Sequence, residues 1–293
     1  MTADNQRGAG VSAPAPAKIN LCLKVLGRRP DGYHELDTVM ARLDLADRLW
    51  LDTVPDDRED RLEMVNSPDG LPAGFCGPDN LILKAAAAFR RAAGWPDQGL
   101  VVKLEKNIPL GAGLGGGSSD CAAVLSLLNQ LAPRPLSREA LAGLGRSLGA
   151  DVPFFLQPAP VARARGIGEK FSRPPAEFEG WAGRGLILVN PGLSLSTAQV
   201  FKNWDLTNPS ANNNLGPISP PQPGENDLLA PAGRLVPVLS EVIGAIEVLK
   251  PSAWGLSGSG PTFWLYCPSA AADEWRARYP QWWWRDIKIT DKR

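Results

Sequence analysis

The segment PLGAGLGGGSSD contains five glycines among the seven residues from Gly111 to Gly117. Glycine loses more conformational freedom on folding than any other residue, so a run this dense is expected where something must approach bare backbone. A strand pattern, LVVKLE at 100–105, precedes this glycine run, and a helical pattern follows it. A helix start offers unpaired N–H groups and the positive end of the helix dipole, which both favour phosphate. The glycine run is therefore predicted to bind phosphate, with the Ser118 and Ser119 hydroxyls as further donors.

The glycine run does not by itself say which nucleotide binds. No lysine follows it, so the Walker A pattern is not met. Gly111, Gly113 and Gly116 do fit G-x-G-x-x-G, the pattern of dinucleotide-binding folds. However, the acidic residue expected about 20 residues further on is missing, and the pattern does not follow the first strand of a βαβ series. An oxidoreductase with a dinucleotide cofactor stays open as a second hypothesis.

Composition narrows the class of protein. The 293 residues carry 31 Lys+Arg and 31 Asp+Glu, and this zero net charge argues against a general nucleic-acid or membrane-surface binder. No apolar run approaches the roughly 18–20 residues that span a bilayer, and the first residues lack the apolar core of a secretory signal. We expect a cytoplasmic protein, a monomer or homodimer, that binds a small molecule rather than nucleic acid or membrane.

Metal sites built from histidine or cysteine, and thiol chemistry, are not indicated. His34 is the only histidine, which excludes metal sites built from several histidines. A Ser-His-Asp triad would have to use this residue. The four cysteines lie far apart and form no C-x-x-C pair, so a structural zinc site is not expected. They are expected to be free and mostly buried; they are Cys22, Cys76, Cys121 and Cys267.

The first half of the chain reads as mixed strands and helices. Residues 17–26, AKINLCLKVL, alternate in polarity and predict a strand with Lys18 and Asn20 on the face opposite the apolar one. A helix is predicted over 80–93, with Asp79 or Asn80 as N-cap and Gly94 as its end. The helix after the glycine run is expected to be capped by Ser118, Ser119 or Asp120, and another helix to run from Ser137 to Gly149. Further strands are predicted at 36–43, 48–54, 61–65 and 100–105.

The second half predicts strands, helices and long loops. A linker or surface loop is expected at 173–185, a buried strand at 186–191, and an irregular loop at 203–225. Residues 226–249 are helical in pattern, interrupted by Pro231 and Pro237. A second glycine turn in 255–267 leads into a strand. The final WWWRDIKIT predicts a last strand, whose tryptophans are expected in core or inter-domain packing rather than stacked on bases.

Four segments together resemble the GHMP kinase superfamily, which includes galactokinase, homoserine kinase and mevalonate kinase. The glycine run is similar to its phosphate loop. The other segments are PAKINLCLKVLGRRPDGYHEL (16–36), LGADVPFFL (148–156) with ARGIGE (164–169), and GLSGSGPTFWLY (255–266). The AKINL and DGYHEL pieces resemble the branch whose members phosphorylate the 2-hydroxyl of a cytidine diphosphate ester of methylerythritol, on the non-mevalonate route to isoprenoids. The resemblance runs in patches from about residue 14 to 267.

The resemblance implies an ATP-dependent small-molecule kinase that uses Mg²⁺. Lys18 and Asp151 match its catalytic positions, with Asp151 as the base that takes the hydroxyl proton and Lys18 as the cation that offsets developing charge. Phosphoryl transfer is mostly positioning and electrostatics, so a base, a cation and a phosphate cradle suffice. A loop serine, Ser118 or Ser119, would lie close to Mg²⁺. No acidic Mg²⁺ ligand can be named from the sequence.

The resemblance also implies two sets of binding residues. Asn20, Tyr33, His34 and Phe201 would surround the cytosine. In the phosphate loop, replacing Gly116 by valine is expected to abolish ATP binding, because the side chain would block the phosphate and disfavour a backbone with positive φ. The thermal unfolding of the fold is expected to stay broadly similar. A third motif, Gly258, Ser259 and Gly260, would close near the loop. The ATP-binding positions would be Pro109, Gly111, Ala112, Gly113, Leu114, Gly115, Gly116, Gly117, Ser118, Ser119, Asn80 and Lys106.

Without the resemblance, each of these residues has a plainer interpretation. Asp151, two residues before Pro153, would cap a short helix. Lys18 would be a solvated strand lysine, Tyr33 and His34 would belong to a turn, and residues 258–260 would form an ordinary β-turn. A homoserine- or mevalonate-type kinase and a non-catalytic binding module also stay open, although a binding module needs neither Lys18 nor Asp151.

The expected fold is α+β, the two-domain GHMP kinase fold. The first domain, residues 1–170, would carry the ATP loop and begin with a disordered lead-in over about 1–13. The second, residues 171–293, would be ferredoxin-like, with substrate in the cleft between. Cys121, where alanine is usual in the resembled loop, is expected to be a buried replacement.

Overall fold

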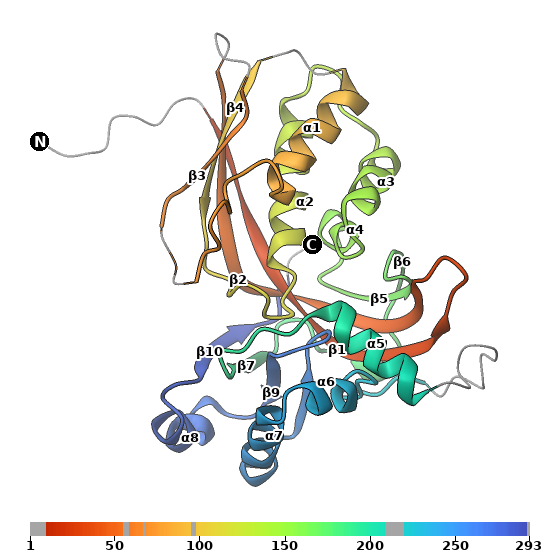
Figure 1. The fold of residues 1–293 in the computed structure, drawn as a ribbon, viewed down its shortest axis with the longest axis vertical. Helices are drawn as coiled ribbons and strands as arrows, with labels where there is room; N and C mark the ends of the chain where they lie inside the picture. The colour runs from red at the N-terminus through yellow and green to blue at the C-terminus, as the bar shows by residue number, and fades with distance from the viewer. Residues whose placement is uncertain are drawn as a thin grey trace, which may run out of the picture. The chain divides into compact units, whose positions relative to one another are not determined.

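The computed structural model describes residues 10–54, 59–66, 68, 70–94, 98–208 and 220–291. Strands and helices are mixed along the chain, as the α+β prediction requires (Figure 1). In chain order they are β1 (Val11–Arg28), β2 (His34–Val54), β3 (Arg61–Met64), α1 (Leu81–Ala93), β4 (Gly99–Glu105), α2 (Gly116–Leu131), α3 (Arg138–Leu148), α4 (Val152–Leu156), β5 (Val161–Gly166), β6 (Lys170–Ser172), η1 (Ala176–Phe178), β7 (Gly185–Asn190), α5 (Thr197–Thr207), α6 (Leu229–Leu235), α7 (Val238–Leu249), β8 (Ala253–Leu256), β9 (Phe263–Tyr266), η3 (Ser269–Ala272), α8 (Asp273–Arg278) and β10 (Trp283–Lys288).

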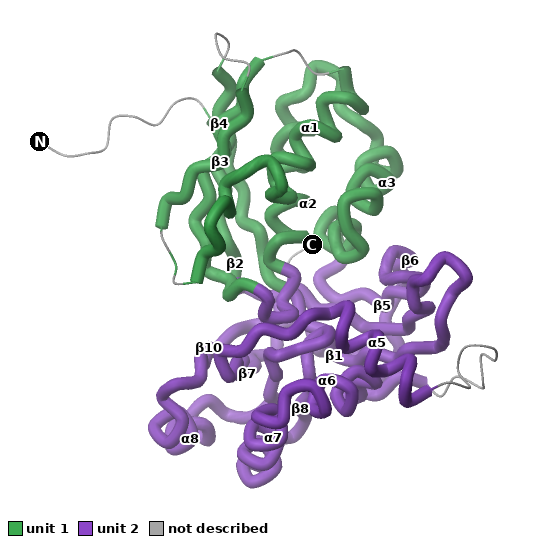
Figure 2. Tube along the Cα trace, in the orientation of Figure 1, with its two compact units in different colours: residues 1–17, 46–110, 116–158 green, residues 18–45, 111–115, 159–293 purple. Residues whose placement is uncertain are grey.

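The chain divides into two compact units, neither continuous in sequence (Figure 2). Unit 1 comprises residues 1–17, 46–110 and 116–158, and unit 2 comprises residues 18–45, 111–115 and 159–293. Strands β1 and β2 and the glycine run therefore contribute residues to both units. The predicted contiguous domains, 1–170 and 171–293, stay a prediction.

Unit 1 is a sheet covered on one face by helices α1 to α4 (Figure 1). Strand β4 pairs antiparallel with β2, where Arg48 lies opposite Glu105, and parallel with β3. The core between sheet and helices is apolar, and Leu49, Leu100 and Phe89 are fully buried in it. Cys121 is fully buried there too, as expected. Burying such side chains contributes about 1.5–3 kcal/mol each relative to exposure.

Helix ends in unit 1 follow the sequence signals with one exception. The Asn80 side chain accepts from Ile82 N and caps α1, which ends at Gly94 in the left-handed conformation with φ 61°. Ser137 caps α3 in the same way, with Ala140 N as donor. Helix α2 begins at Gly116, earlier than expected, so Ser118, Ser119 and Asp120 lie inside it instead of capping it. Gly115, at φ 71°, makes the earlier start possible because glycine tolerates that conformation.

Unit 2 contains a second sheet with the antiparallel order β10-β7-β9-β8. Helices α5, α6 and α7 contribute Trp204, Ala232 and Val242 to its apolar core, which Leu23 of β1 completes. In the first sheet, the first half of β2 pairs antiparallel with β5, and β5 pairs with β6.

Two predictions for the first strands were wrong. Strand β1 begins at Val11, so the predicted lead-in over about 1–13 overlaps a strand; residues 1–9 lie outside the described part of the chain. Among the described strands, β1 pairs with β2 alone. On such an edge strand, every second N–H group points away from the partner strand, so Pro14 and Pro16 can lie there without removing a hydrogen bond of the sheet. The predicted strands 36–43 and 48–54 form one continuous strand, β2.

In the second half, several loops are more ordered than expected. The predicted surface loop 173–185 buries Phe178 and Trp181, and the Trp181 ring lies edge-on to Trp264 with centroids 5.5 Å apart. Pro231 lies in the first turn of α6 rather than interrupting a helix, since a first turn does not need its N–H. Helix α5 extends to Thr207, and residues 209–219 of the predicted loop lie outside the described residues.

The C-terminal aromatic cluster packs into unit 2. Trp282 is 6% exposed and stacks on Tyr279 with ring centroids 4.0 Å apart. This agrees with the prediction of core packing rather than base stacking for these tryptophans.

In the described residues, no helix is long and apolar enough to cross a membrane, and His, Cys, Asp and Glu form no group of three that could hold a metal. All four cysteines are free, but only Cys22 and Cys121 are buried; Cys76 is exposed.

Candidate active site

In unit 2, Lys18 and Asn20 form a buried polar pair on β1. Lys18 Nζ donates a 2.7 Å hydrogen bond to Asn20 Oδ1, and Asn20 Nδ2 donates to Thr38 Oγ1 on β2 at 2.8 Å. Lys18 is 4% exposed and Asn20 is 3% exposed, so the plain interpretation of Lys18 as a solvated strand lysine was wrong. The backbone N–H of Lys18 also donates to Leu114 O, which anchors the glycine run to this strand.

The turn after β8 packs directly on the glycine run. Ser257 Oγ donates to Gly113 O at 2.9 Å. A Cβ placed on Gly113 would lie 2.5 Å from Ser257 O, and the φ of Gly113 is 75°, so close approach and backbone conformation both require glycine here. A Cβ on Gly258 would lie 3.5 Å from Lys18 Nζ. The predicted third motif therefore meets both the glycine run and the predicted catalytic lysine within unit 2.

Asn226 holds this turn in place. Its Nδ2 donates to Leu256 O and to Gly258 O, both at 2.8 Å, while its Oδ1 accepts from Leu228 N. Both donors of the amide nitrogen are therefore used on the turn. The sequence analysis did not single out Asn226, and the turn-forming PGEND around it was the available signal.

His34 and Phe201 are brought together, also within unit 2. Their rings stack with centroids 4.6 Å apart and an interplanar angle of 25°. His34 Nε2 lies 2.7 Å from Asp205 Oδ1, and Tyr33, next to it in the chain, is 58% exposed. Asp205 is not among the predicted site residues, although it follows Phe201 by one helical turn on α5.

In unit 1, the first turn of α2 combines open space beside its backbone with a buried polar side chain. A Cβ on Gly117 would have nothing within 4 Å, so its backbone faces open space. Ser119 is 1% exposed, and its Oγ has no hydrogen-bond partner among the described residues. A buried hydroxyl without a partner is costly unless a ligand satisfies it. These features fit a phosphate bound at this helix start.

Gly116 differs from the expectation for it. Its φ is not among the positive values found at other glycines of the run, and a Cβ there would lie 2.9 Å from Lys106 Nζ and 3.2 Å from Ile108 Cγ2. The expectation that Gly116→Val leaves the fold unaffected was therefore wrong, because the new side chain would disturb Lys106 inside the protein.

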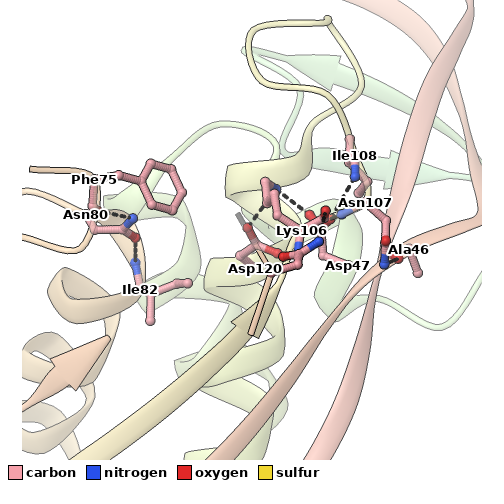
Figure 3. Close-up of polar contacts among 10 residues, drawn as sticks. Ala46, Asp47, Phe75, Asn80, Ile82, Lys106, Asn107, Ile108 and Asp120 are labelled. Atoms are coloured by element: carbon pink, nitrogen blue, oxygen red, sulfur yellow. Dashed lines mark hydrogen bonds and ion pairs between the residues drawn. The ribbon is translucent and has the colours of Figure 1, made fainter. Parts of the chain in front are cut away.

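Lys106 lies in a buried cluster with two carboxylates (Figure 3). Its Nζ pairs with Asp47 Oδ2 and, at 3.0 Å, with Asp120 Oδ2. Asp47 Oδ1 also accepts from the backbone of Asn107 and Ile108, which fixes the chain leading into the glycine run. We call Asp47, Lys106 and Asp120 the buried triad.

The buried triad holds two carboxyl groups and one amine, and the pKa values of Asp120 and Lys106 are shifted in it. Burial raises the pKa of Asp120 to about 7, and the Asp47 carboxylate adds to the rise while Lys106 opposes it. Burial lowers the pKa of Lys106, but Asp120 and Asp47 outweigh burial and raise it.

Lys106 and Asn80 were both expected near the adenosine. In the structure, Asn80 caps α1 and its side-chain amide donates a hydrogen bond to Phe75 O (Figure 3).

Asp151 occupies the N-cap position of α4, with Pro153 in the first turn, but its side chain makes no capping hydrogen bond. Asp151 therefore lies where a capping residue is expected, but its carboxylate does not form the capping hydrogen bond. A carboxylate at this position has the chemistry to accept a proton from a hydroxyl group.

Comparison with known proteins places the chain in a family. The model of the GHMP kinases N terminal domain matches residues 80–158. The 4-diphosphocytidyl-2-C-methyl-D-erythritol kinase of Desulfotalea psychrophila is 39% identical over 85% of this chain and 82% of its own length, and that of Pelobacter propionicus is 40% identical over 90% and 92%.

Solved structures agree with these relatives. A crystal structure of 4-(cytidine 5'-diphospho)-2C-methyl-D-erythritol kinase covers 95% of this chain and 99% of its own at 36% identity, with a TM-score of 0.72. Methanococcus jannaschii mevalonate kinase shares the fold, with a TM-score of 0.67 at 15% identity over 97% of this chain and all of its own. The expected α+β fold of the GHMP kinases is confirmed, and the chain belongs to the 4-diphosphocytidyl-2-C-methyl-D-erythritol kinase family.

Proposed function

We propose that this protein transfers the γ-phosphate of ATP to the 2-hydroxyl of 4-diphosphocytidyl-2-C-methyl-D-erythritol, a step of the non-mevalonate route to isoprenoids. The relatives named for this activity cover most of the chain at about 40% identity. The observation that carries the proposal is the buried Lys18–Asn20 pair beside the 257–260 turn and the glycine run in unit 2. A lysine kept 4% exposed at a phosphate-type loop suits phosphoryl transfer.

ATP and Mg²⁺ are the cofactors of the proposal. The glycine run and the first turn of α2 would hold the phosphates through backbone N–H groups. The Ser119 hydroxyl, buried without a described protein partner, would face the phosphate or its Mg²⁺. Mg²⁺ would neutralise charge on the phosphates during transfer.

Asp151 and Lys18 are proposed as catalytic residues. Asp151, at the N-cap position of α4, would accept the proton of the 2-hydroxyl. Lys18 would offset the negative charge that develops on the transferred group, held in orientation by Asn20 Oδ1.

Tyr33, His34, Phe201 and Asn20 are proposed to bind the cytosine. The stacked rings of His34 and Phe201 are an apolar and hydrogen-bonding surface suited to a base, and the exposed Tyr33 is the neighbour of His34 in the chain. Asn80 and Lys106 are proposed to lie near the adenosine. The chain segments around them would make the contacts, because the Asn80 side chain caps α1 and the Lys106 side chain bonds to Asp120. A cytoplasmic monomer or homodimer remains the expected state.

The test is ADP release with a panel of alcohols: the cytidine diphosphate ester, its uridine analogue, mevalonate, homoserine and galactose. Turnover should require the cytidine ester, because groups that hydrogen-bond the cytosine edge lose about 1–3 kcal/mol each when its donors and acceptors are reversed. Preference for mevalonate or homoserine would show another GHMP kinase. Binding of NAD(H) without ATP turnover would support the dinucleotide hypothesis.

A further inference from the structure

Helix α5 presents three side chains to the ring of His34 from one face. Phe201 stacks on the ring, Trp204 meets it edge-on with centroids 5.6 Å apart, and Asp205 Oδ1 lies 2.7 Å from Nε2. These residues are spaced i, i+3 and i+4, the spacing that places side chains on one side of a helix. The imidazole is thus fixed in both its plane and its rotation.

The contact with Asp205 also sets which nitrogen carries the ring hydrogen. A carboxylate only accepts hydrogen bonds, so the hydrogen shared at 2.7 Å must belong to His34 Nε2. In the neutral imidazole the other nitrogen, Nδ1, is then an acceptor. Arg28 Nη1 lies 3.6 Å from the second oxygen of Asp205.

We propose that Asp205 is a specificity-determining positioning residue, which holds His34 Nδ1 as an acceptor for an exocyclic amino group of the substrate base. This inference rests on the proposed function, which places His34 at the cytosine. Cytosine carries an amino donor where uracil carries a carbonyl acceptor. A uridine ester would set its carbonyl against the Nδ1 lone pair, whereas a cytidine ester would donate to it.

A purely structural role for Asp205 predicts something different. If Asp205 only joined α5 to the start of β2, its loss would lower stability and leave the choice between bases unchanged. The tautomer would then be irrelevant to discrimination. The experiment therefore measures the tautomer and the base preference separately.

The first measurement uses the fact that His34 is the only histidine in the chain. Full-length protein labelled with ¹⁵N-histidine gives a single imidazole, and protonated and bare ring nitrogens have clearly different ¹⁵N shifts. The wild type should show a protonated Nε2 and a bare Nδ1. Asp205→Asn should show a mixture of tautomers, because an amide can donate as well as accept.

The second measurement is the ratio of kcat/KM for the cytidine ester to that for its uridine analogue. Asp205→Asn should lower this ratio by about tenfold or more, the scale of one mismatched buried hydrogen bond. The change should fall mainly on KM, since Asp205 acts on the base and not on the transferred phosphate. Asp205→Glu restores an acceptor-only partner and should recover part of the ratio.

Arg28→Gln is the matched control. It removes the other charged partner of Asp205 but keeps the carboxylate on Nε2, so the tautomer and the ratio should stay close to wild type. The side chain of Arg28 is 51% exposed, so its loss should disturb the fold little.

A wild-type ring protonated on Nδ1, or on both nitrogens at the assay pH, would overturn the proposal. So would an Asp205→Asn variant that shifts the tautomer but keeps the full preference for cytidine. If the wild type shows the expected tautomer but turns over neither ester, the proposed function fails and the base-reading role falls with it. If it turns over both esters equally while showing that tautomer, the specificity inference and the expected requirement for cytidine fail, and the kinase activity stands.

Discussion

The hydroxyl of Ser257 donates a 2.9 Å hydrogen bond to the carbonyl of Gly113, and this bond ties the turn after β8 to the glycine run. Ser257 is fully buried, whereas Gly113 is partly exposed. The same hydroxyl accepts from the backbone N–H of Asn20 at 3.3 Å. One side chain thus links the predicted phosphate loop to the strand that carries Lys18 and Asn20.

Ser257→Ala should weaken ATP binding by about tenfold. The change removes the hydrogen bond to the part-buried Gly113 carbonyl, which costs about 0.5–1.5 kcal/mol, and frees the loop from its ordered position. Calorimetric titration with ATP measures the affinity. Ser269→Ala, which removes an exposed serine hydroxyl bonded to Asp286, is the control and should bind ATP normally. Equal affinity in both variants would mean that the turn does not order the loop for ATP.

A second prediction compares two helical glycines of unit 1. Gly117→Ala and Gly143→Ala each add a methyl group where nothing lies within 4 Å, and both replace glycine by a better helix former. Neither should lower the melting temperature. Gly117→Ala alone should reduce ATP affinity, because its methyl group would occupy the open space above the α2 N-terminus where phosphate is proposed to bind. Unchanged affinity in Gly117→Ala would place the phosphates elsewhere.

The buried triad predicts a pH dependence of stability. The folded state raises the pKa of Asp120 from 3.8 to about 7, chiefly by burial. Between these values the folded protein binds more protons than the unfolded chain, so the free energy of unfolding should fall as pH rises through this window. Asp120→Asn removes the titration and keeps an oxygen acceptor for Lys106 Nζ, so the fall should flatten.

Denaturant unfolding at several pH values between about 4 and 8 measures this slope. Asp273→Asn, at a carboxylate whose side chain is 67% exposed, is the control and should keep the wild-type slope. Identical slopes in all three proteins would show that Asp120 titrates normally in the folded state.

Local signals in the sequence predicted local structure well. The caps Asn80 and Ser137 and the end at Gly94 depend on hydrogen bonds and conformations within a few residues, so their sequence patterns are sufficient. The glycine run was recognised for the same reason. What it packs against was not, because Ser257 is 144 residues away from Gly113 in the chain.

Long-range polar contacts account for the rest of what sequence reasoning missed. Lys106 and Asp47 are 59 residues apart, and His34 and Asp205 are 171 apart. Each of these residues alone looks like an ordinary surface charge or a turn residue. The start of α2 at Gly116 was misplaced because three good capping residues follow it, and burial of Ser119 and Asp120 outweighs their capping preference.

The last prediction separates the proposed base from a structural role. Asp151→Asn is nearly isosteric, and asparagine suits the N-cap position of α4 as well as aspartate does, so the melting temperature should change little. An amide cannot accept the hydroxyl proton as a base. General base catalysis typically contributes about 10²–10⁴-fold, so kcat should fall by about that factor, or roughly 3–5 kcal/mol of barrier.

Single-turnover rates and calorimetric affinities test this together with Lys18→Met. Affinities for ATP and the cytidine ester should stay within several-fold of wild type in Asp151→Asn, because the loss concerns the transition state rather than binding. The double variant should lose less than the product of the two single losses, since both groups are proposed to serve one proton transfer and its charge. Near-normal turnover in an Asp151→Asn variant that melts many degrees lower would show that Asp151 stabilises α4 and that another group is the base.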